Sequence, residues 1–220
     1  MQQETYGPQD FHAALALDRL ADFYRLHKSF DLALPVYERA LGILERPGKT
    51  KTTVEWAMFG NELFTIGNSL RDQRRYDQAE AYYRRAETAY DRANPPQSHA
   101  NGYIWGALGH LFVLQGKYDE AEDQLKKLLA WDERNAPPGS SMVFTDLMNL
   151  ESEVYLPQQK YPEAEETIRR EMAIGEKLYG PDSLQVADRL EALAGVLRRL
   201  ARPDEADQAE ARAKSIRRQH

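Results

Sequence analysis

The chain has 220 residues and contains 29 Lys and Arg, 35 Asp and Glu, and no cysteine. Its formal net charge of −6 at pH 7 argues against binding to a nucleic-acid backbone, and the lack of cysteine excludes disulfides and thiol chemistry. No run of about 18 apolar residues could span a membrane, and the N-terminus lacks the basic start and apolar stretch of a secretory signal. We therefore expect a cytoplasmic protein, with a periplasmic or secreted location as the alternative if an N-terminal segment has been removed.

One pattern occurs five times along the chain, with 46, 42, 43 and 42 residues between successive copies. Each copy contains an alanine near the start of a helix, called the anchor below: Ala33, Ala79, Ala121, Ala164 and Ala206. Twelve residues before each anchor lies a small residue: Ala21, Gly67, Gly109, Ser152 and Ala194. Sixteen residues before it lies a large one: Leu17, Leu63, Trp105, Met148 and Leu190. A period of this length with fixed large and small positions indicates an all-α solenoid of about five helix-turn-helix units.

The expected units form one domain, 1–220, and cover approximately residues 6–46, 47–94, 95–135, 136–180 and 181–220. Each unit should contain a first helix, A, and a second helix, B, because apolar residues lie three and four positions apart. In the third unit, helix A is expected from about Asn101 to Gln115, and helix B is expected to start after Tyr118-Asp119 and to continue to about Arg134. Proline and glycine between the units should end the helices, as in Arg46-Pro47-Gly48, Asn94-Pro95-Pro96 and Tyr179-Gly180-Pro181-Asp182.

The first unit begins with an apolar helix that no earlier unit covers. Its helix A, expected from Phe11 to Leu26, has more apolar residues than one neighbouring helix can bury. The preceding Glu4-Thr5-Tyr6-Gly7-Pro8 copies the junction from Glu176 to Pro181, which elsewhere lies between two units. We expect the uncovered face to form a homodimer about a two-fold axis, or to dock a removed N-terminal segment.

Before the second unit, Gly48-Lys49-Thr50 has the ending of a phosphate-binding loop. The upstream glycine that such a loop requires is one residue out of register, at Gly42, and is expected inside a helix. We therefore interpret the tripeptide as a linker between units, and we expect no nucleotide or other cofactor.

In the third unit, Trp105 occupies the large position of helix A, so we expect a buried indole between helices. Gly109 occupies the small position, where two helices come close. Gly106 is expected on the ligand-facing side, where its missing side chain would make room for a ligand backbone. Contact between helices is the competing interpretation of Gly106.

The fourth unit departs from the pattern in both helices. An apolar stripe runs through Val143, Leu147, Leu150 and Val154, whereas the large positions of the pattern fall on Met148 and Tyr155. A π-type bulge would resolve this conflict of one residue and would fit the longer spacing of 43. In helix B, Glu171 stands where other units have the small residues Ala40, Ala86 and Ala213.

The fifth unit ends in a polar helix whose apolar contacts are limited to Ala209, Ala213 and Ile216. A polar outer face is what the last unit of a solenoid needs for solubility.

The segments LADFYRLHKSFDLALPVYERALGI and LGHLFVLQGKYDEAEDQLKKLL, with the junction EKLYGPDSLQVADRL, resemble tetratricopeptide repeats. The similarity is to the longer type of about 42 residues found in kinesin light chains and many bacterial proteins, and it extends over residues 6 to 220. The resemblance implies a right-handed superhelix whose A helices line a concave groove that binds peptides.

The groove face is expected 18, 15, 11 and 8 residues before each anchor. Asparagines recur there, and their amides could bind the N–H and C=O groups of an extended peptide, although three in phase could also arise by chance. Acids flank them at both ends, at Asp18, Asp22, Asp146, Asp188 and Glu191. The candidate groove residues are Asn61, Phe64, Asn68, Arg71, Tyr103, Gly106, His110, Asn149 and Glu153.

No catalytic or metal-binding set is recognisable, so we expect a protein that is not an enzyme and holds no metal. The expected function is a protein-interaction scaffold for a peptide with basic or neutral residues, without nucleic acid or a membrane span. The family's carboxylate clamp for acidic C-termini is not reproduced, because Asp18 and Asp22 stand where it needs a lysine and an asparagine. The alternatives are a regulatory or sensor domain of a larger protein, recognising a signalling peptide or small molecule, and a structural assembly subunit.

Overall fold

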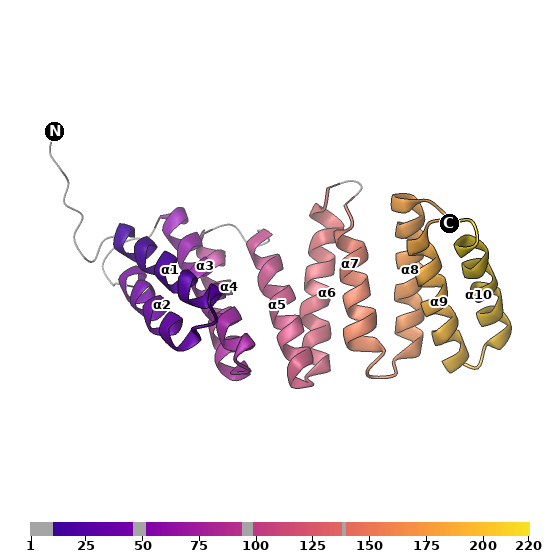
Figure 1. Ribbon diagram of the computed structural model, residues 1–220, viewed down its shortest axis with the longest axis horizontal. Helices are drawn as coiled ribbons and strands as arrows, with labels where there is room; N and C mark the ends of the chain where they lie inside the picture. Colours follow the sequence, from indigo (N-terminus) through magenta and orange to yellow (C-terminus); the bar gives the residue numbers. More distant parts are fainter. Residues whose placement is uncertain (1–10, 46–51, 94–98, 138–139) are drawn as a thin grey trace. The chain divides into compact units, whose positions relative to one another are not determined.

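The computed structural model describes residues 11–45, 52–93, 99–137 and 140–220 (Figure 1). Every regular element in these ranges is a helix, as the repeat pattern predicted. The first five are α1 (Phe11–Leu26), α2 (Phe30–Leu44), α3 (Thr53–Asp72), α4 (Tyr76–Ala93) and α5 (His99–Gln115). The others are α6 (Tyr118–Asn135), α7 (Met142–Asn149), η1 (Leu150–Tyr155), α8 (Tyr161–Tyr179), α9 (Leu184–Arg199) and α10 (Pro203–Arg217).

The chain divides into two compact units, Met1–Leu111 (unit 1) and Phe112–His220 (unit 2), and the boundary lies within α5. These two units are larger than the five helix-turn-helix units of the sequence pattern, which are called repeats below. In unit 1, α1 packs on α2 and α3 packs on α4, each pair forming a hairpin, and α2 also contacts α3. In unit 2, α6 contacts α7. Helix α7 continues into η1, and both pack against α8. Helix α9 packs on α8 and on α10. The all-α fold of stacked hairpins is therefore confirmed, whereas the single domain of 1–220 stays a prediction.

Every helix A ends in the same turn, five residues before the anchor. The backbone there enters the left-handed region, with φ between 57° and 73°, at Lys28, Arg74, Gly116, Gln159 and Ala201. The following N–H donates across the turn to the carbonyl five residues back, as from Lys117 N to Phe112 O at 2.9 Å. These features define a Schellman motif. Only one of the five positions is a glycine, so the turn was visible in the sequence only in the third repeat.

The anchor alanines are all 0 % exposed, which explains why this position is constant. The small position twelve residues earlier has an equally direct cause in the second hairpin. A Cβ atom added to Gly67 would lie 2.6 Å from the ring of Tyr83, closer than atoms pack. The ring of Tyr83 thus occupies the space that a side chain at position 67 would need.

The expectation of a buried indole at Trp105 is wrong. Trp105 is only half-buried, and its Nε1 donates to Glu87 Oε1 at 3.0 Å. Since the indole N–H needs a polar partner, the ring keeps one edge near the surface. The buried tryptophan of the third repeat is Trp131 on α6, which is 6 % exposed.

The π-helix η1 confirms the bulge that the fourth repeat predicted. One of its wider turns carries a backbone hydrogen bond from Leu156 N to Glu151 O, at 2.9 Å, which spans five residues. The additional residue shifts every position before it by one relative to the other repeats. Each residue of α7 therefore corresponds to the residue of α3 or α9 that lies one position nearer to its own anchor.

This shift corrects two assignments in the fourth repeat. The sequence pattern placed Met148 at the large position and Ser152 at the small one, but Met148 is half-buried and Ser152 is exposed. The buried residues at these places are Leu147 and Glu151, which are 1 % and 3 % exposed. A carboxyl group thus occupies a position that other repeats fill with alanine or glycine.

Ion pairs join the B helices of successive repeats. A glutamate twelve residues after one anchor pairs with an arginine six residues after the next: Glu45 with Arg85, Glu133 with Arg170, and Glu176 with Arg212. All six side chains are more than a third exposed, so each pair contributes only about 0–1 kcal/mol. Their contribution to the stability of the fold is therefore small.

The last helix and the junction before it agree with the sequence. On α10, Ala209, Ala213 and Ile216 are buried, and α8 ends at Tyr179 ahead of Gly180-Pro181. The expectations for Glu4 to Pro8, Arg46 to Thr50 and Asn94 to Pro96 lie outside the described residues, as does the side chain of Phe11.

Candidate functional site

Most residues of the candidate groove face in unit 1 are accessible. Asn61, Tyr103 and His110 are exposed, with Tyr103 at 71 %, and the set of half-buried residues is Phe64, Asn68, Arg71 and Gly106. Tyr103 is the most exposed of the large hydrophobic side chains in the described ranges, so its ring is accessible to a ligand. Arg71 pairs with its neighbour Asp72 at 3.0 Å.

The two asparagines of unit 1 are held by tyrosines of helix B. Tyr83 OH donates to Asn68 Oδ1 at 2.8 Å, and Tyr90 OH donates to Asn61 Oδ1 at 2.5 Å. Burial raises the pKa of both tyrosines to about 12, so their hydroxyls stay protonated and keep donating at neutral pH. With the carbonyl oxygens occupied, each asparagine presents its NH₂ group as a fixed donor.

The first repeat contains the same arrangement with an acid. Tyr37 OH donates to Asp22 Oδ1 at 2.7 Å, and the two residues occupy the same repeat positions as Tyr83 and Asn68. Arg25 Nε also donates to Asp22 Oδ1, at 3.0 Å. The Asp22 carboxylate is therefore already bound by a cation and a hydroxyl.

In unit 2, the two candidate residues lie at the π-helix. Asn149 is the last residue of α7 and Glu153 lies within η1, and both are half-buried. Because Asn149 precedes the extra residue, it is one position out of phase with the column that counting back from the anchor gave it. Asn61 and Asn68 thus form a pair on α3, and Asn149 lies in a different position of its repeat.

The same shift explains the burial of Asp146, which the sequence pattern placed among the acids of the groove face. Asp146 is 5 % exposed and faces Asp132 on α6, which is 3 % exposed. Burial, and then hydrogen bonding to Asp132, raise the pKa of Asp146 far above its ordinary value. The acids Asp188 and Glu191 are exposed, but Arg217 binds them at 2.5 and 2.8 Å.

Glu62 on α3 was missed by the sequence pattern. It is 5 % exposed, and burial raises its pKa to about 9, with further contributions from a hydrogen bond to Asp18 and from the charges of Asp18 and Asp22. Its Oε1 atom receives no hydrogen bond from the protein. The sequence did contain a signal for a buried acid at this position. The corresponding residue is Ile104 in α5, which is apolar, and Asp146 in α7 once the π shift is counted, which is a second acid.

A second buried carboxyl cluster lies in unit 2. Arg189 Nη1 on α9 is 3.0 Å from Glu151 Oε2 and 3.0 Å from Glu171 Oε2. Glu171 is 0 % exposed, and its pKa is raised to about 7 by burial and by the charge of Glu151, against the effect of Arg189. The unusual glutamate noticed at position 171 thus belongs to an ionic trio.

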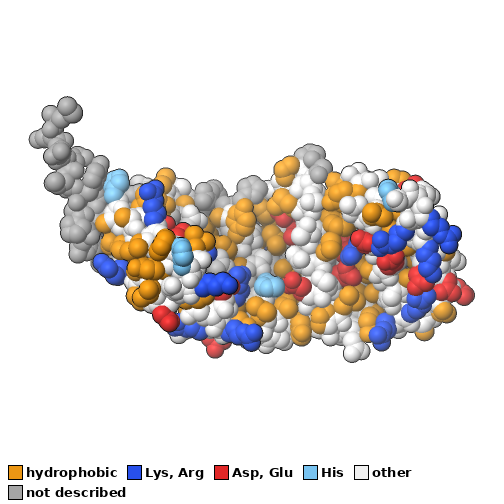
Figure 2. All heavy atoms as spheres, viewed as in Figure 1, with side chains coloured by type: hydrophobic (Ala, Val, Ile, Leu, Met, Phe, Trp, Pro, Cys, Tyr) orange, Lys and Arg blue, Asp and Glu red, His pale blue; other side chains and the backbone are white. Residues whose placement is uncertain are grey.

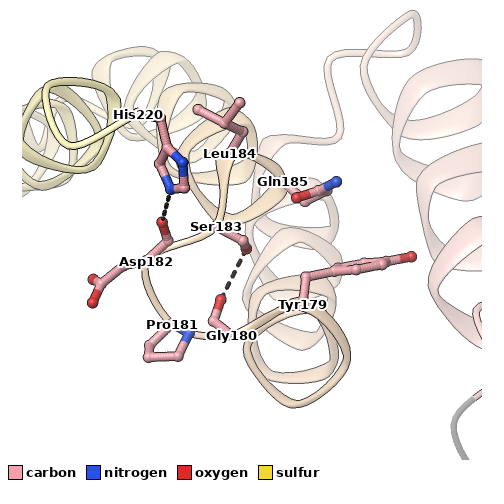
Figure 3. Close-up of a pocket in the computed structure, with 8 residues that line it drawn as sticks. All are labelled: Tyr179, Gly180, Pro181, Asp182, Ser183, Leu184, Gln185 and His220. Atoms are coloured by element: carbon pink, nitrogen blue, oxygen red, sulfur yellow. Dashed lines mark hydrogen bonds between the residues drawn. The ribbon is translucent and has the colours of Figure 1, made fainter.

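A pocket of about 510 Å³ lies at the junction of α8 and α9 and includes His220 (Figure 3). Ser183 Oγ donates to Gly180 O at 2.8 Å and accepts from Val186 N, which caps α9. His220 Nε2 lies 2.9 Å from the backbone oxygen of Asp182, and the Asp182 carboxylate points away from the imidazole (Figure 3). The serine, histidine and aspartate around this pocket are therefore not arranged as a nucleophile, base and orienting acid.

In the described ranges, no three His, Asp or Glu side chains converge in a way that could hold a metal ion. None of the described helices is both long and apolar enough to cross a bilayer.

Sequence comparison identifies the repeats. A family model described as tetratricopeptide repeat matches residues 61–134 and 146–219, together more than half of the chain. A search of curated protein sequences found no match.

Solved structures agree with this fold. BtubC (BKLC) from P. vanneervenii superposes with a TM-score of 0.70 at 20 % identity, covering 91 % of this chain and 78 % of that one. A putative kinesin light chain from Podosopora anserina, with nearly identical repeats, gives 0.71 at 13 % identity and covers 96 % of both chains. YrrB, described as a tetratricopeptide repeat protein with an unusual peptide-binding site, gives 0.59 at 16 % identity, covering 97 % of this chain and 90 % of its own. At these identities the likeness concerns the fold alone.

Proposed function

Since the chain belongs to the tetratricopeptide repeat family, we propose that it is a non-catalytic scaffold that binds a peptide segment of a partner protein on its A helices. The fold is one that serves in protein interaction, and the YrrB structure is described as having a peptide-binding site. The proposed contact residues in unit 1 are Asn61, Phe64, Asn68, Arg71, Tyr103, Gly106 and His110. Those in unit 2 are Asn149 and Glu153.

The observation that carries the proposal is the pair of fixed asparagines on α3. The side-chain oxygen of each asparagine accepts a hydrogen bond from the hydroxyl of a buried tyrosine, at 2.8 Å for Asn68 and 2.5 Å for Asn61. Its NH₂ group can then donate to a peptide carbonyl without first being ordered, which lowers the entropy cost of binding. Such donors recognise the peptide backbone and not its side chains. They therefore favour extended peptides of many sequences and do not select one specific sequence.

Removing the asparagines together with their tyrosine hydroxyls should weaken peptide binding about tenfold or more, because two donors to the ligand are lost. The variant is Asn61→Ala/Asn68→Ala/Tyr83→Phe/Tyr90→Phe. Its unfolding free energy should change little, since both partners of each hydrogen bond are deleted. Affinity for peptides selected from a random displayed library, measured by calorimetry, gives the result.

Two controls separate binding from stability in this experiment. Asn68→Ala alone leaves the Tyr83 hydroxyl, in a fully buried side chain, without a partner, and should cost about 1–3 kcal/mol of stability. Asn135→Ala, on α6 and outside the candidate face, should leave the affinity unchanged and should cost no more stability than the hydrogen bond from its side chain to Trp131 O, about 0.5–1.5 kcal/mol. Native affinity in the fourfold variant would show that the asparagines do not contact the peptide.

A role as an assembly subunit is favoured by one other observation, the apolar surface of the first hairpin. Leu20, Phe23 and Leu26 on α1 are 42, 55 and 70 % exposed, and Leu32 on α2 is 56 % exposed. Hydrophobic side chains gather over α1 and α2 in Figure 2. Adjacent apolar side chains of this size mark interaction surfaces, so we propose that two copies pair through this edge.

Light scattering of the 220-residue chain should therefore give the mass of a dimer at high concentration, and Phe23→Glu/Leu26→Glu should reduce it to a monomer. The helical content should be unchanged, because both side chains are exposed. Leu184→Glu, at a leucine of unit 2 that is 42 % exposed, is the control and should leave the dimer intact. A native chain that is monomeric throughout, or a dimer that survives the double change, contradicts this proposal.

A further inference from the structure

Two carboxyl groups in unit 1 face one another with no donor from the protein between them. Glu62 on α3 is 5 % exposed, and its buried Oε1 receives no hydrogen bond. The neighbouring charged groups are Asp18 and Asp22 on α1, which are acceptors as well. Asp22 is already bound by Arg25 and Tyr37, at 3.0 and 2.7 Å. Within the described ranges, no lysine or arginine forms an ion pair with Asp18 or Glu62.

Unit 2 shows how this fold satisfies such a pair when a cation is available. Glu151 and Glu171, 3 % and 0 % exposed, hold the Arg189 guanidinium between them at 3.0 Å each. Arg189 and Glu62 occupy the same repeat position, 17 residues before their anchors. The position that supplies the cation in unit 2 therefore supplies a second acid in unit 1.

In the free chain, a proton takes the place of that cation. Burial, followed by the hydrogen bond and the charge of Asp18 and the charge of Asp22, raises the pKa of Glu62 to about 9. At neutral pH the Glu62 carboxyl is therefore protonated and donates to Asp18. A proton held in this way can be replaced by any cation that reaches the two carboxyl groups. Asp18 is half-buried, so the pair is accessible from its side.

We propose that Asp18 and Glu62 form a subsite for the guanidinium or ammonium group of an arginine or lysine in the bound peptide, which replaces their shared proton. The inference rests on the peptide-binding function proposed above and assigns a residue class to its ligand. Asn61, adjacent to Glu62 in the chain, would hold the peptide backbone while the basic side chain enters between the acids. The displaced proton passes to the solvent, so binding and proton release are coupled.

The test compares two blocked peptides that differ at one central residue, arginine or its uncharged isostere citrulline, in an otherwise alanine and serine sequence. Calorimetry at neutral pH in phosphate and in Tris buffer measures affinity and proton release together. The arginine peptide should bind about tenfold more tightly, as expected for hydrogen bonds to a charged group, and should release a proton. The citrulline peptide should bind without proton release.

Two variants assign the effect to the subsite. Glu62→Gln keeps a donor toward Asp18 but cannot titrate, so it should abolish both the preference for arginine and the proton release. Asp18→Asn removes one of the two acids and should weaken the preference for arginine. Glu38→Gln, at an exposed acid on α2, should change neither. Circular dichroism confirms that each variant is folded.

The outcomes separate the subsite from the general function. Equal binding of both peptides to the native chain, or a preference for arginine that survives in Glu62→Gln, overturns the subsite while peptide binding stands. If Glu62→Gln loses affinity for both peptides to the same extent, Glu62 only supports the fold. This result also overturns the subsite. If neither peptide binds the native chain, the proposed function fails, and the subsite fails with it.

Discussion

Replacing Arg189 with methionine should lower the unfolding free energy by about 3–5 kcal/mol, because two carboxyl groups would remain buried without their cation. Glu151 and Glu171 are 3 % and 0 % exposed, and both are bound to Arg189 at 3.0 Å. Denaturant unfolding of the 220-residue chain, followed by circular dichroism, measures the loss. A loss below about 1 kcal/mol would mean that solvent already reaches the trio.

Two further variants identify the cause of this loss. Arg217→Met breaks an exposed pair with Asp188 and Glu191, at 2.5 and 2.8 Å, and should cost less than about 1 kcal/mol. Adding Glu151→Gln and Glu171→Gln to Arg189→Met should recover most of the lost stability, because no charge is then left buried. Methionine keeps the apolar stem of the arginine, so the comparison isolates the charge.

The stability of the protein should fall as the pH rises from about 5 to 9, the reverse of the usual acid sensitivity of carboxylates. The pKa of Glu62 is raised to about 9 and that of Glu171 to about 7, both mainly by burial, and that of Asp146 is raised in the same direction. Between its unfolded and folded pKa values, each group holds a proton that the unfolded chain has lost. The stabilisation that each group provides is therefore complete below its pKa in the unfolded chain, and it is lost as the pH rises through its pKa in the folded protein.

Urea unfolding over a series of pH values measures the slope, which should be about −1.4 kcal/mol per pH unit for each proton held only by the folded chain. Glu62→Gln should remove one such contribution and should therefore stabilise the protein most at alkaline pH. The exposed Glu38→Gln should leave the profile unchanged. A profile that is flat from pH 5 to 9 would falsify the protonated state assigned to Glu62.

The fold was predictable because packing imposes the same demand on every repeat. The anchor alanines are fully buried, and Gly67 lies against a tyrosine ring, so these positions tolerate only small residues. The π-helix was predictable for the same reason, since one apolar stripe and one repeat pattern disagreed by a residue. Its effect on positions further upstream was not drawn from the sequence, and this misplaced Met148, Ser152 and Asp146.

The chemistry of the candidate site was less predictable, because it depends on pairs that the repeat pattern does not join. The asparagines were found as a row, but their tyrosine partners lie 15 and 29 residues away on another helix. One signal was available, since Asp22 with Tyr37 and Asn68 with Tyr83 occupy the same two repeat positions. Glu62 and Arg189 share one repeat position with Asp146, but the charge there changes sign between repeats and α5 has Ile104 at that place, so the pattern did not reveal which acids would meet a cation.

The π-helix also bears on how this chain can change in length during evolution. It takes up one additional residue inside a single helix, and the next anchor follows at the ordinary spacing of 42. The hairpin turn at Gln159 and the pair between Glu176 and Arg212, both further along the chain, keep the geometry found in the other repeats. This insertion of one residue is therefore confined to one hairpin, and the turn and the anchor spacing after it are those of the other repeats. Repeats of this protein can diverge by insertions as well as by substitutions, each one independently of the rest.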